Sequence, residues 1–382
     1  AMAVGGPCVL SANTGHLDII KDDNCYALND QRLVTGSDER KAMWRESQVE
    51  EIVEKLEKIY TDRAQARARA ETGVEDWVGA VGLGVCGTGA EYFSEFAVAL
   101  MVIDTPPGGY QLFERAGDVG VPSASPGFGG VPFVVLHVDS SNENLLEDME
   151  IISDVTNGFL VGGLTNNAGP NHQVAGGFTG GGISGVVLAP EVPVITALSQ
   201  GCAPIGDVHH VDKAAENIIA EIDGRPALEV LKDDIGEVLA RDLRRAAGFI
   251  HAALPIIGSD TGDYVVRNLI GFDEERGLIA IAAPVETGDP ILFVSRDASA
   301  ARDDLTAMLE KLKSRAGNAN NIKGAHYISC IARGPNMFGG ENAELGLVRE
   351  ILGDIPLVGM YANGEISNDR LYSYTGVLTL FV

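Results

Sequence analysis

Two ionisable residues each follow an apolar run in the C-terminal part of the chain. Arg333 closes the strand-like run CIARG, and Glu365 follows LVGMY after a short polar turn. A guanidinium at the end of a buried strand is costly unless a carboxylate meets it. We therefore expect Arg333 to bind a carboxylate, either of the protein or of a ligand. A direct pairing of Arg333 or Arg267 with Glu365, as an internal strut, is the structural alternative.

A thiol and two imidazoles occur together in SQGCAPIGDVHH. Cys202 precedes His209 and His210 in a segment whose composition predicts a turn-rich loop. A thiol beside an imidazole can form a thiolate nucleophile, so a Cys-dependent enzyme using Cys202 is one hypothesis. The alternative is that Cys202 is a small, half-buried residue between Gly201 and Pro204.

Other chemical motifs are weak. GLGVCGTG lacks the lysine of a phosphate-binding loop, and a strand rather than a helix is expected after it. The seven histidines form no HExxH or HxH pattern and the five cysteines form no CxxC pair, so neither a metal site nor a disulfide framework is predicted. Haem needs only one axial histidine, so haem stays open as a cofactor.

The composition sets the class of protein. The chain has 382 residues, 45% of them hydrophobic, which suffices for one large two-lobed unit or two domains. Its formal net charge is −26, so we expect neither nucleic acid nor an anionic membrane surface as a partner. No apolar run approaches the roughly 20 residues of a membrane span, and the first residues do not resemble a signal peptide, so a cytoplasmic protein is expected.

Helical and strand-like runs alternate along the chain. Apolar residues at helical spacing predict helices over residues 47–70, 211–254 with a break at Asp223, 299–315 and 339–354. Strand-like runs are expected over residues 263–273, 277–285, 290–296, 324–334 and 355–361. Short connections favour antiparallel pairing around residues 264–296.

A strand-turn-strand plan occurs three times, over residues 76–108, 157–190 and 355–382. It indicates an internal pseudo-repeat, with three unrelated β-hairpins as the alternative. Together these patterns predict an α/β (mixed α+β) fold. We expect two related lobes of mixed, partly antiparallel sheets flanked by helices, with stacked sheets as one arrangement.

Several motifs resemble the FIST family. GCAPIGDVHHVDKAAENIIAEIDGRPAL is similar to the family's central junction, and YVVRNLIGFD, ISCIARG and IPLVGMYANGEIS resemble its C-terminal half. VGAVGLGVCGTGAEYFSEFAVALMVI and LVGGLTNN resemble its N-terminal half. The resemblance covers residues 44–382 in order. It implies a FIST N-terminal lobe over 44–215, a FIST C-terminal lobe over 216–382, and a leader over 1–43.

The resemblance implies a bacterial sensory module for signal transduction. FIST domains were proposed to bind small ligands such as amino acids, a subgroup is described as haem proteins that sense nitric oxide, and a related eukaryotic region accompanies an F-box. No kinase, cyclase or F-box segment follows the FIST part of this sequence. We therefore expect the signal to pass to a separately encoded partner, such as a histidine kinase or a cyclic-nucleotide enzyme.

An amino-acid-like ligand needs a cation for its carboxylate and an acceptor for its amine. Arg333 and Glu365 would supply this pair in a cleft between the lobes, with Arg267 as a second cation. Other residues expected around the cleft are Gln200, Cys202, Asn217, Asn363 and Gly364. A haem-binding nitric-oxide sensor and a Cys-dependent enzyme are the alternative functions, and no catalytic residue or metal ligand is assigned.

Overall fold

The computed structural model describes residues 76–93, 97–122, 130–165, 173–256 and 263–382, together with the backbone of four short strands near the N-terminus. These four strands form two pairs, β1 (Cys8–Ser11) with β2 (Cys25–Leu28) and β3 (Gln31–Leu33) with β4 (Arg45–Ser47). The helix predicted over residues 47–70 lies outside the described residues, as does most of the predicted leader.

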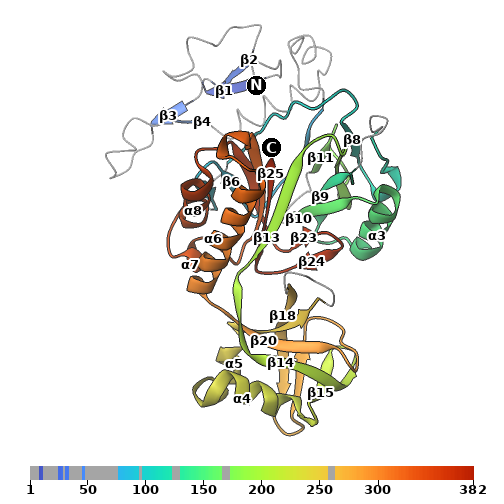
Figure 1. Ribbon diagram of the computed structural model, residues 1–382, viewed down its shortest axis with the longest axis vertical. Coiled ribbons are helices and arrows are strands. Elements are labelled where there is room, and N and C mark those ends of the chain that lie inside the picture. The colour runs from blue at the N-terminus through green and yellow to red at the C-terminus, as the bar shows by residue number, and fades with distance from the viewer. Residues whose placement is uncertain are drawn as a thin grey trace.

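Two bodies make up the rest of the described chain, a larger one drawn above a smaller one in Figure 1. The larger body contains two six-stranded sheets. Sheet I has the order β24 (Arg370–Tyr372), β23 (Glu365–Ser367), β10 (Phe159–Thr165), β9 (Phe133–Asp139), β12 (Ile183–Leu188) and β8 (Tyr110–Phe113). Sheet II has the order β13 (Val194–Gln200), β25 (Thr375–Phe381), β21 (Gly324–Cys330), β22 (Leu357–Ala362), β6 (Gly84–Gly87) and β7 (Ala90–Tyr92). A separate pair joins β5 (Val78–Ala80) to β11 (Gln173–Ala175).

The two sheets stack face to face between helices. Phe133 of β9 packs with Val377 and Phe381 of sheet II, whereas the next residue, Val134, packs on the opposite face with Ile152. Ile152 belongs to α3 (Leu145–Thr156), which covers sheet I. The outer face of sheet II is covered by α6 (Ala298–Arg315), α7 (Gly334–Phe338) and α8 (Ala343–Leu352). The larger body is therefore a helix-sheet-sheet-helix sandwich.

The two sheets share one strand order. Each sheet contains a parallel pair of strands, which is β9–β10 in sheet I and β21–β22 in sheet II. An antiparallel strand lies next to this pair, β12 beside β9 and β25 beside β21. An edge strand follows, β8 beside β12 and β13 beside β25. Each sheet also contains a hairpin from the other half of the chain. The N-terminal hairpin β6–β7 extends sheet II beside β22, and the C-terminal hairpin β23–β24 extends sheet I beside β10. Each sheet thus draws strands from both sides of the boundary predicted at residue 215, and both that boundary and a duplication stay predictions.

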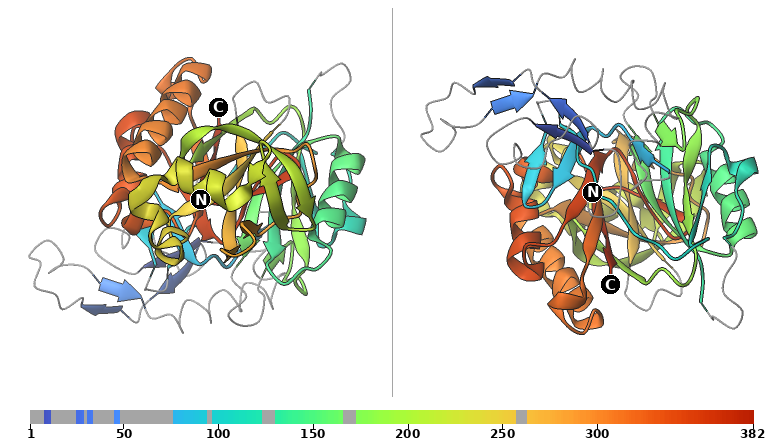
Figure 2. Two further views of the ribbon diagram at one scale, coloured as in Figure 1. Left: turned by 90° about the horizontal axis from the view of Figure 1, so that it is seen from below. Right: turned by 90° about the horizontal axis from the view of Figure 1, so that it is seen from above.

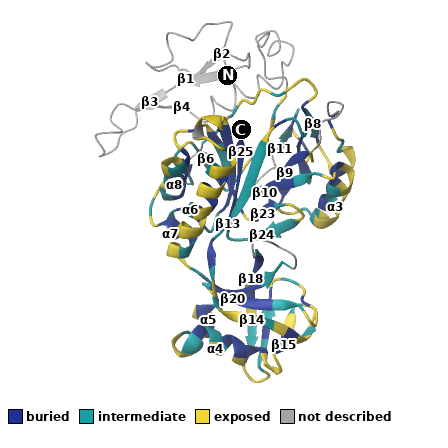
Figure 3. Ribbon diagram, viewed as in Figure 1, coloured by how far each residue is buried: buried dark blue, intermediate teal, exposed yellow. Residues whose placement is uncertain are grey.

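The smaller body is a closed antiparallel barrel. Its strands follow the order β14 (Cys202–Ala215), β20 (Pro290–Arg296), β17 (Ile250–Pro255), β18 (Tyr264–Asp273), β19 (Leu278–Ile281) and β15 (Ile218–Ile222), and β15 pairs back onto β14. The two-residue strand β16 (Arg225–Pro226) extends β15. In the view from below, α4 (Ala227–Ala240) lies across the end of the barrel (Figure 2), and α5 (Leu243–Ala246) follows it. Figure 3 shows the strands of the sandwich largely buried, and exposed residues on the outer helix faces, on the loops and along the barrel strand β14.

The barrel is inserted into the sandwich through two neighbouring strand ends. The chain leaves sheet II at Gln200, enters the barrel at Cys202, and returns from Arg296 into α6. Cys202 and Arg296 are backbone partners in the pairing of β14 with β20. The two connections therefore lie side by side at a single junction.

The mixed α/β class is confirmed, as are the strands predicted after residue 263, the helices α6 and α8, and antiparallel pairing of β18 with β19. The helix predicted over residues 211–222 is wrong. This segment forms the end of strand β14 and strand β15, which place the side chains of Val211, Ile219 and Ile222 in the barrel core. The chain turns between the two strands at Glu216, which has a φ of 55°. The helix predicted after the break at Asp223 ends earlier than expected, since Ile250–Pro255 form strand β17. No strand forms over residues 97–104, contrary to the first strand-turn-strand prediction.

Among the helices of the described residues, none combines the length and the apolar character that a membrane span requires.

Candidate functional site

Arg333 does meet a carboxylate, but that carboxylate belongs to Glu344 rather than to Glu365. Arg333 follows β21, and α7 turns the chain so that Glu344, in the first turn of α8, lies back over the strand. Nε of Arg333 lies 2.8 Å from Oε1 of Glu344, and both side chains are fully buried. The hydroxyls of Tyr327 and Ser329 also donate to Oε1 of Glu344, at 2.7 and 3.0 Å. The predicted strut therefore exists with a different partner.

Further contacts of Arg333 are also within the protein. Its Nη1 donates to the backbone oxygen of Ser199 at 3.2 Å, and its Nη2 donates to Oγ of Ser199 at 3.3 Å. Its guanidinium lies 5.1 Å from the ring centroid of Phe338. Burial alone would lower the pKa of Arg333, but Glu344 raises it above the ordinary value. Arg333 thus ties β21, α8 and β13 together, and its role toward a ligand stays a prediction.

Glu365 begins β23 and is fully buried. Its Oε2 accepts hydrogen bonds from the backbone nitrogen and the hydroxyl of Thr375, at 3.2 and 2.8 Å. Its Oε1 has no partner among the described residues. Burial raises the pKa of Glu365 to about 8, against the opposing effects of Thr375 and Cys330. The carboxyl group is therefore largely protonated at neutral pH.

Three other predicted residues lie where the sandwich meets the barrel. Gln200 donates through Nε2 to the backbone oxygen of Tyr264 at 2.9 Å. The hydroxyl of Tyr264 donates to the backbone oxygen of Cys202 at 2.6 Å. Arg267, half-buried in the barrel, donates through Nη2 to the backbone oxygen of Leu371 in the sandwich at 3.2 Å. These contacts fasten one body to the other.

The remaining predicted residues are Asn217, Asn363 and Gly364. Asn217 lies just beyond the end of β14 opposite to Cys202. Asn363 is exposed. Gly364 is buried and has a φ of 154°, and a Cβ on it would lie 3.0 Å from Leu164. Asn217 is thus separated from Cys202 by the length of β14, and a single cleft that contains all these residues stays a prediction.

Cys202 does not form the thiol–imidazole pair of the enzyme hypothesis. It lies in a strand rather than in a loop, and His209 is seven positions further along that strand. Nδ1 and Nε2 of His209 instead form hydrogen bonds with Asp223 and Asp234, at 2.7 and 2.9 Å. Burial raises the pKa of Cys202 to about 12 despite two nearby arginines. A buried thiol of this kind is a poor nucleophile at neutral pH.

Tyr374 lies at the centre of a cluster of contacts between the sandwich and the barrel, and none of the residues in this cluster is a predicted site residue. Tyr374 lies in the sandwich between β24 and β25, but its ring stacks on His251 of β17 with centroids 4.6 Å apart. The guanidinium of Arg296 lies 5.4 Å from the centroid of the same ring. The hydroxyl of Tyr374 donates to Oδ1 of Asn268 at 2.7 Å. One sandwich side chain therefore contacts three strands of the barrel.

Buried polar atoms without partners occur around Tyr374. Within the described chain, both ring nitrogens of His251 and Nε of Arg296 have no hydrogen-bond partner. Nη2 of Arg296 donates to the backbone oxygen of Ala332 at 2.6 Å. Burial lowers the pKa of His251 to about 4, helped by Arg296, so its ring is neutral at pH 7. Each unmet hydrogen bond of a buried group costs about 1–3 kcal/mol, so these atoms call for a partner.

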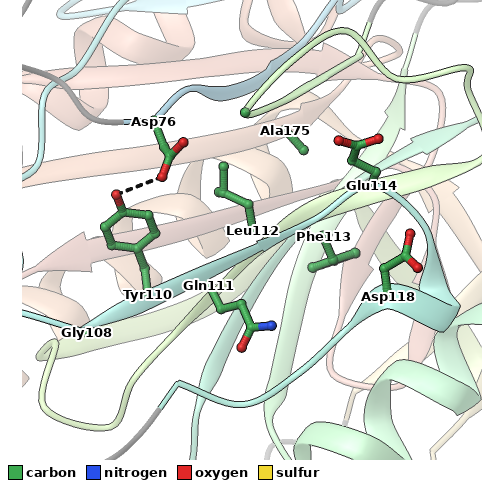
Figure 4. Close-up of a pocket in the computed structure, with 10 residues that line it drawn as sticks. Asp76, Gly108, Tyr110, Gln111, Leu112, Phe113, Glu114, Asp118 and Ala175 are labelled. Carbon is green, nitrogen blue, oxygen red and sulfur yellow. Dashed lines mark hydrogen bonds between the residues drawn. The ribbon is translucent and has the colours of Figure 1, made fainter. Parts of the chain in front are cut away.

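A pocket of about 620 Å³ lies along β8, away from the junction (Figure 4). Its lining includes Asp76, Gln111, Glu114 and Asp118, and the hydroxyl of Tyr110 donates to Oδ2 of Asp76 at 3.1 Å. A second pocket, of about 350 Å³, is lined in part by residues 315–323 and the C-terminal residue. None of the predicted ligand-binding residues lines either pocket.

No histidine lines either of these two pockets, so neither supplies the axial histidine that haem requires. The described ranges hold no group of three or more histidine, cysteine, aspartate or glutamate residues that could bind a metal ion.

Two family models match the chain. The FIST N domain matches residues 56–225, and the FIST C domain matches residues 227–368.

The matches to curated relatives each cover only part of this chain. The uncharacterized protein Rv0628c of Mycobacterium tuberculosis is 34% identical over 215 residues, which are 53% of this chain and 54% of the relative. The uncharacterized protein Mb0898c of Mycobacterium bovis is 35% identical over 214 residues, 53% of each chain. The F-box/LRR-repeat protein At5g63520 of Arabidopsis thaliana is 28% identical over 196 residues, 49% of this chain and 34% of the relative. The chain spans about half the length of the mycobacterial relatives, and a smaller part of the plant protein.

Proposed function

Because this chain is a member of the FIST domain family, with a FIST N domain and a FIST C domain, we propose that it is a sensory module that binds a small polar metabolite where the sandwich meets the barrel. One observation carries the proposal. Buried polar atoms of both bodies, in Glu365 of the sandwich and in His251 and Arg296 of the barrel, have no hydrogen-bond partner in the described chain. A small polar ligand would satisfy such atoms, and an amino-acid-like metabolite fits the polarity of the site.

The junction supports a mechanism for passing on the signal. The barrel is joined to the sandwich through the adjacent strand ends at Cys202 and Arg296, so a rotation about this point disturbs few backbone contacts. Bodies of one chain that share a small interface generally move relative to each other. A ligand held between them would favour one relative orientation, and the orientation would then be read by a separately encoded signalling protein.

Access to the junction requires movement. Neither of the two pockets described above is lined by Glu365, His251 or Arg296, and the atoms of these residues without partners are buried. The ligand would therefore bind an arrangement in which the barrel has shifted away from the sandwich, and its affinity would be reduced by the fraction of molecules in the closed arrangement.

A thermal-shift screen tests this function. The purified full chain is heated with single amino acids, hydroxy acids, sugars and nucleosides at constant ionic strength. Binding to the native state raises the melting temperature, because it stabilises by RT ln(1 + [L]/Kd). We expect at least one compound to do so in a saturable manner. An absorption spectrum of protein grown with a haem precursor tests the haem alternative in parallel. If no compound raises the melting temperature, the sensor function is contradicted.

A further inference from the structure

We propose that Arg296, His251 and Tyr374 form a binding site for the carboxylate group of a small organic acid. The inference rests on the proposed function and gives it a ligand class and a set of residues. None of the three residues has a functional assignment from the sequence motifs, and all three meet at the junction of the two bodies.

Arg296 supplies the cation. Its guanidinium is half-buried at the end of β20, its Nη2 is held by the backbone oxygen of Ala332, and its Nε has no partner in the described chain. In the described part of the chain it forms no ion pair, although aspartate and glutamate outnumber lysine and arginine by 54 to 28. A planar guanidinium with a free N–H donor matches the geometry of a carboxylate.

His251 supplies a neutral donor beside that cation. The residue is 2% exposed, and neither ring nitrogen has a hydrogen-bond partner in the described chain. A neutral imidazole carries one N–H donor, which a carboxylate oxygen can accept, and one acceptor nitrogen. Burial, and after it the nearby Arg296, lowers the pKa of His251, so His251 stays neutral while Arg296 provides the charge.

Tyr374 closes the site from the sandwich. Its ring lies against both His251 and Arg296, and its hydroxyl reaches exposed Asn268. Tyr374 has a φ of 64°, a conformation that a tyrosine adopts only when its surroundings hold it there. A carboxylate that binds Arg296 would displace the ring, release this strained backbone, and loosen the contact between sandwich and barrel. Ligand binding and movement of the barrel are thereby coupled.

Four sodium salts serve as probes: acetate, L-lactate, L-alanine and L-glutamate, with sodium chloride at equal ionic strength as the reference. Melting temperature and titration calorimetry are measured on the full chain. We expect at least one carboxylate to bind the wild type, and Arg296→Gln to weaken that binding at least about tenfold. Arg276→Gln, which changes an exposed arginine of the same barrel, is the matched control and should bind like the wild type.

His251→Phe separates a binding role from a structural one. Phenylalanine keeps the stacking on Tyr374 but removes two buried polar atoms without partners. The free variant should therefore melt at the same or a higher temperature than the wild type while binding the carboxylate more weakly. If Arg296→Gln does not fold, Arg296→Lys, which keeps the charge but lacks the planar fork, should fold and bind more weakly than the wild type.

Each result decides a different claim. If Arg296→Gln and His251→Phe both bind a carboxylate as the wild type does, the site is wrong and the sensor function stands. If only compounds without a carboxylate stabilise the protein, the ligand class is wrong and the sensor function again stands. If no compound of the wider screen binds, the proposed function fails, and this inference fails with it.

Discussion

Arg333 and Glu344 form an ion pair that is fully buried, with Nε of the arginine 2.8 Å from Oε1 of the glutamate. The hydroxyl of Tyr361 and the backbone nitrogen of Gly334 donate to the other carboxylate oxygen, at 3.2 and 3.3 Å. Such a carboxylate has no free position for a ligand. The pair therefore fixes the start of α8 on sheet II. The partnerless polar atoms of His251 and Arg296 belong to the barrel instead.

Breaking this pair should be strongly destabilising. Glu344→Gln leaves Arg333 as a buried cation without a counter-charge, and we expect it to lower the free energy of unfolding by about 3–5 kcal/mol. Urea unfolding at pH 7 measures the loss. Asp118→Asn breaks the exposed pair with Arg115 and should change stability by no more than about 0.5 kcal/mol. Equal effects of the two substitutions would contradict a structural role for Glu344.

Glu365 should make the protein less stable as the pH rises. Its pKa is about 8 in the folded chain against an ordinary value of 4.5, so the native state holds the proton more tightly than the unfolded state. The native state is then favoured below pH 4.5, and this advantage is lost progressively as the pH rises toward 8.

Glu365→Gln removes this titration. The variant should match the wild type at about pH 5 and exceed it in stability at about pH 8.5, since each unit of pKa shift corresponds to about 1.4 kcal/mol. Urea unfolding at both pH values provides the comparison. A constant difference between variant and wild type at the two pH values would show that Glu365 does not titrate in this range.

The contribution of His209 to protein stability should depend on pH in the opposite sense to that of a buried neutral histidine. Burial lowers its pKa, but hydrogen bonds to Asp223 and Asp234 outweigh this and raise the pKa above the ordinary 6.5. The stabilisation that protonated His209 gives the folded chain is therefore fully present below pH 6.5, and it is lost as the pH rises through the pKa of His209 in the folded state.

Substitution of the two adjacent histidines provides the test. His209→Gln should lower the melting temperature more at about pH 6 than at about pH 9, because it removes a charge that is present only at the lower pH. His210→Gln is the control, because His210 is exposed and its hydrogen bond to Asp223 comes from the backbone nitrogen, which glutamine retains. Similar losses at both pH values for His209→Gln would rule out the charged pair.

The exchanged hairpins should make the two halves of the chain dependent on each other. Sheet I is completed by β23–β24, and sheet II by β6–β7, each from the other half. We expect fragments 44–215 and 216–382 to fail to fold alone and to form a complex when they are produced together. Size-exclusion chromatography and thermal unfolding measure this. A fragment that unfolds cooperatively as a monomer would show that the exchange is dispensable.

The regular elements of the C-terminal half could be predicted because their apolar spacing fits only one period. Leu305, Leu309 and Leu312 recur at helical intervals and do form the buried side of α6. Ile219 and Ile222 are also three apart, yet they lie in a strand next to a sharp turn. So short a run fits both periods, and closure of the barrel, a non-local contact, decides between them.

The candidate site could be predicted only in part. An arginine that closes an apolar strand indicates a need for a carboxylate, and Arg333 does have one. Its partner Glu344 could not be identified, because the packing of α8 on sheet II places it. Arg296 closes PILFVSR in the same way and could have been selected by the same reasoning. His251 and Tyr374 have no local signal, since they meet only when the barrel contacts the sandwich.

Histidine-ring NMR is the most direct test of a ligand site at the junction. The full chain is labelled with ring-¹³C histidine, the His251 signal is assigned with His251→Phe, and the most strongly stabilising compound of the thermal screen is titrated in. We expect the His251 signal to shift in a saturable manner with the same Kd as in calorimetry, while the exposed His210 signal stays unchanged. A compound that binds with full affinity and leaves the His251 signal unmoved would contradict a sensory site between the sandwich and the barrel.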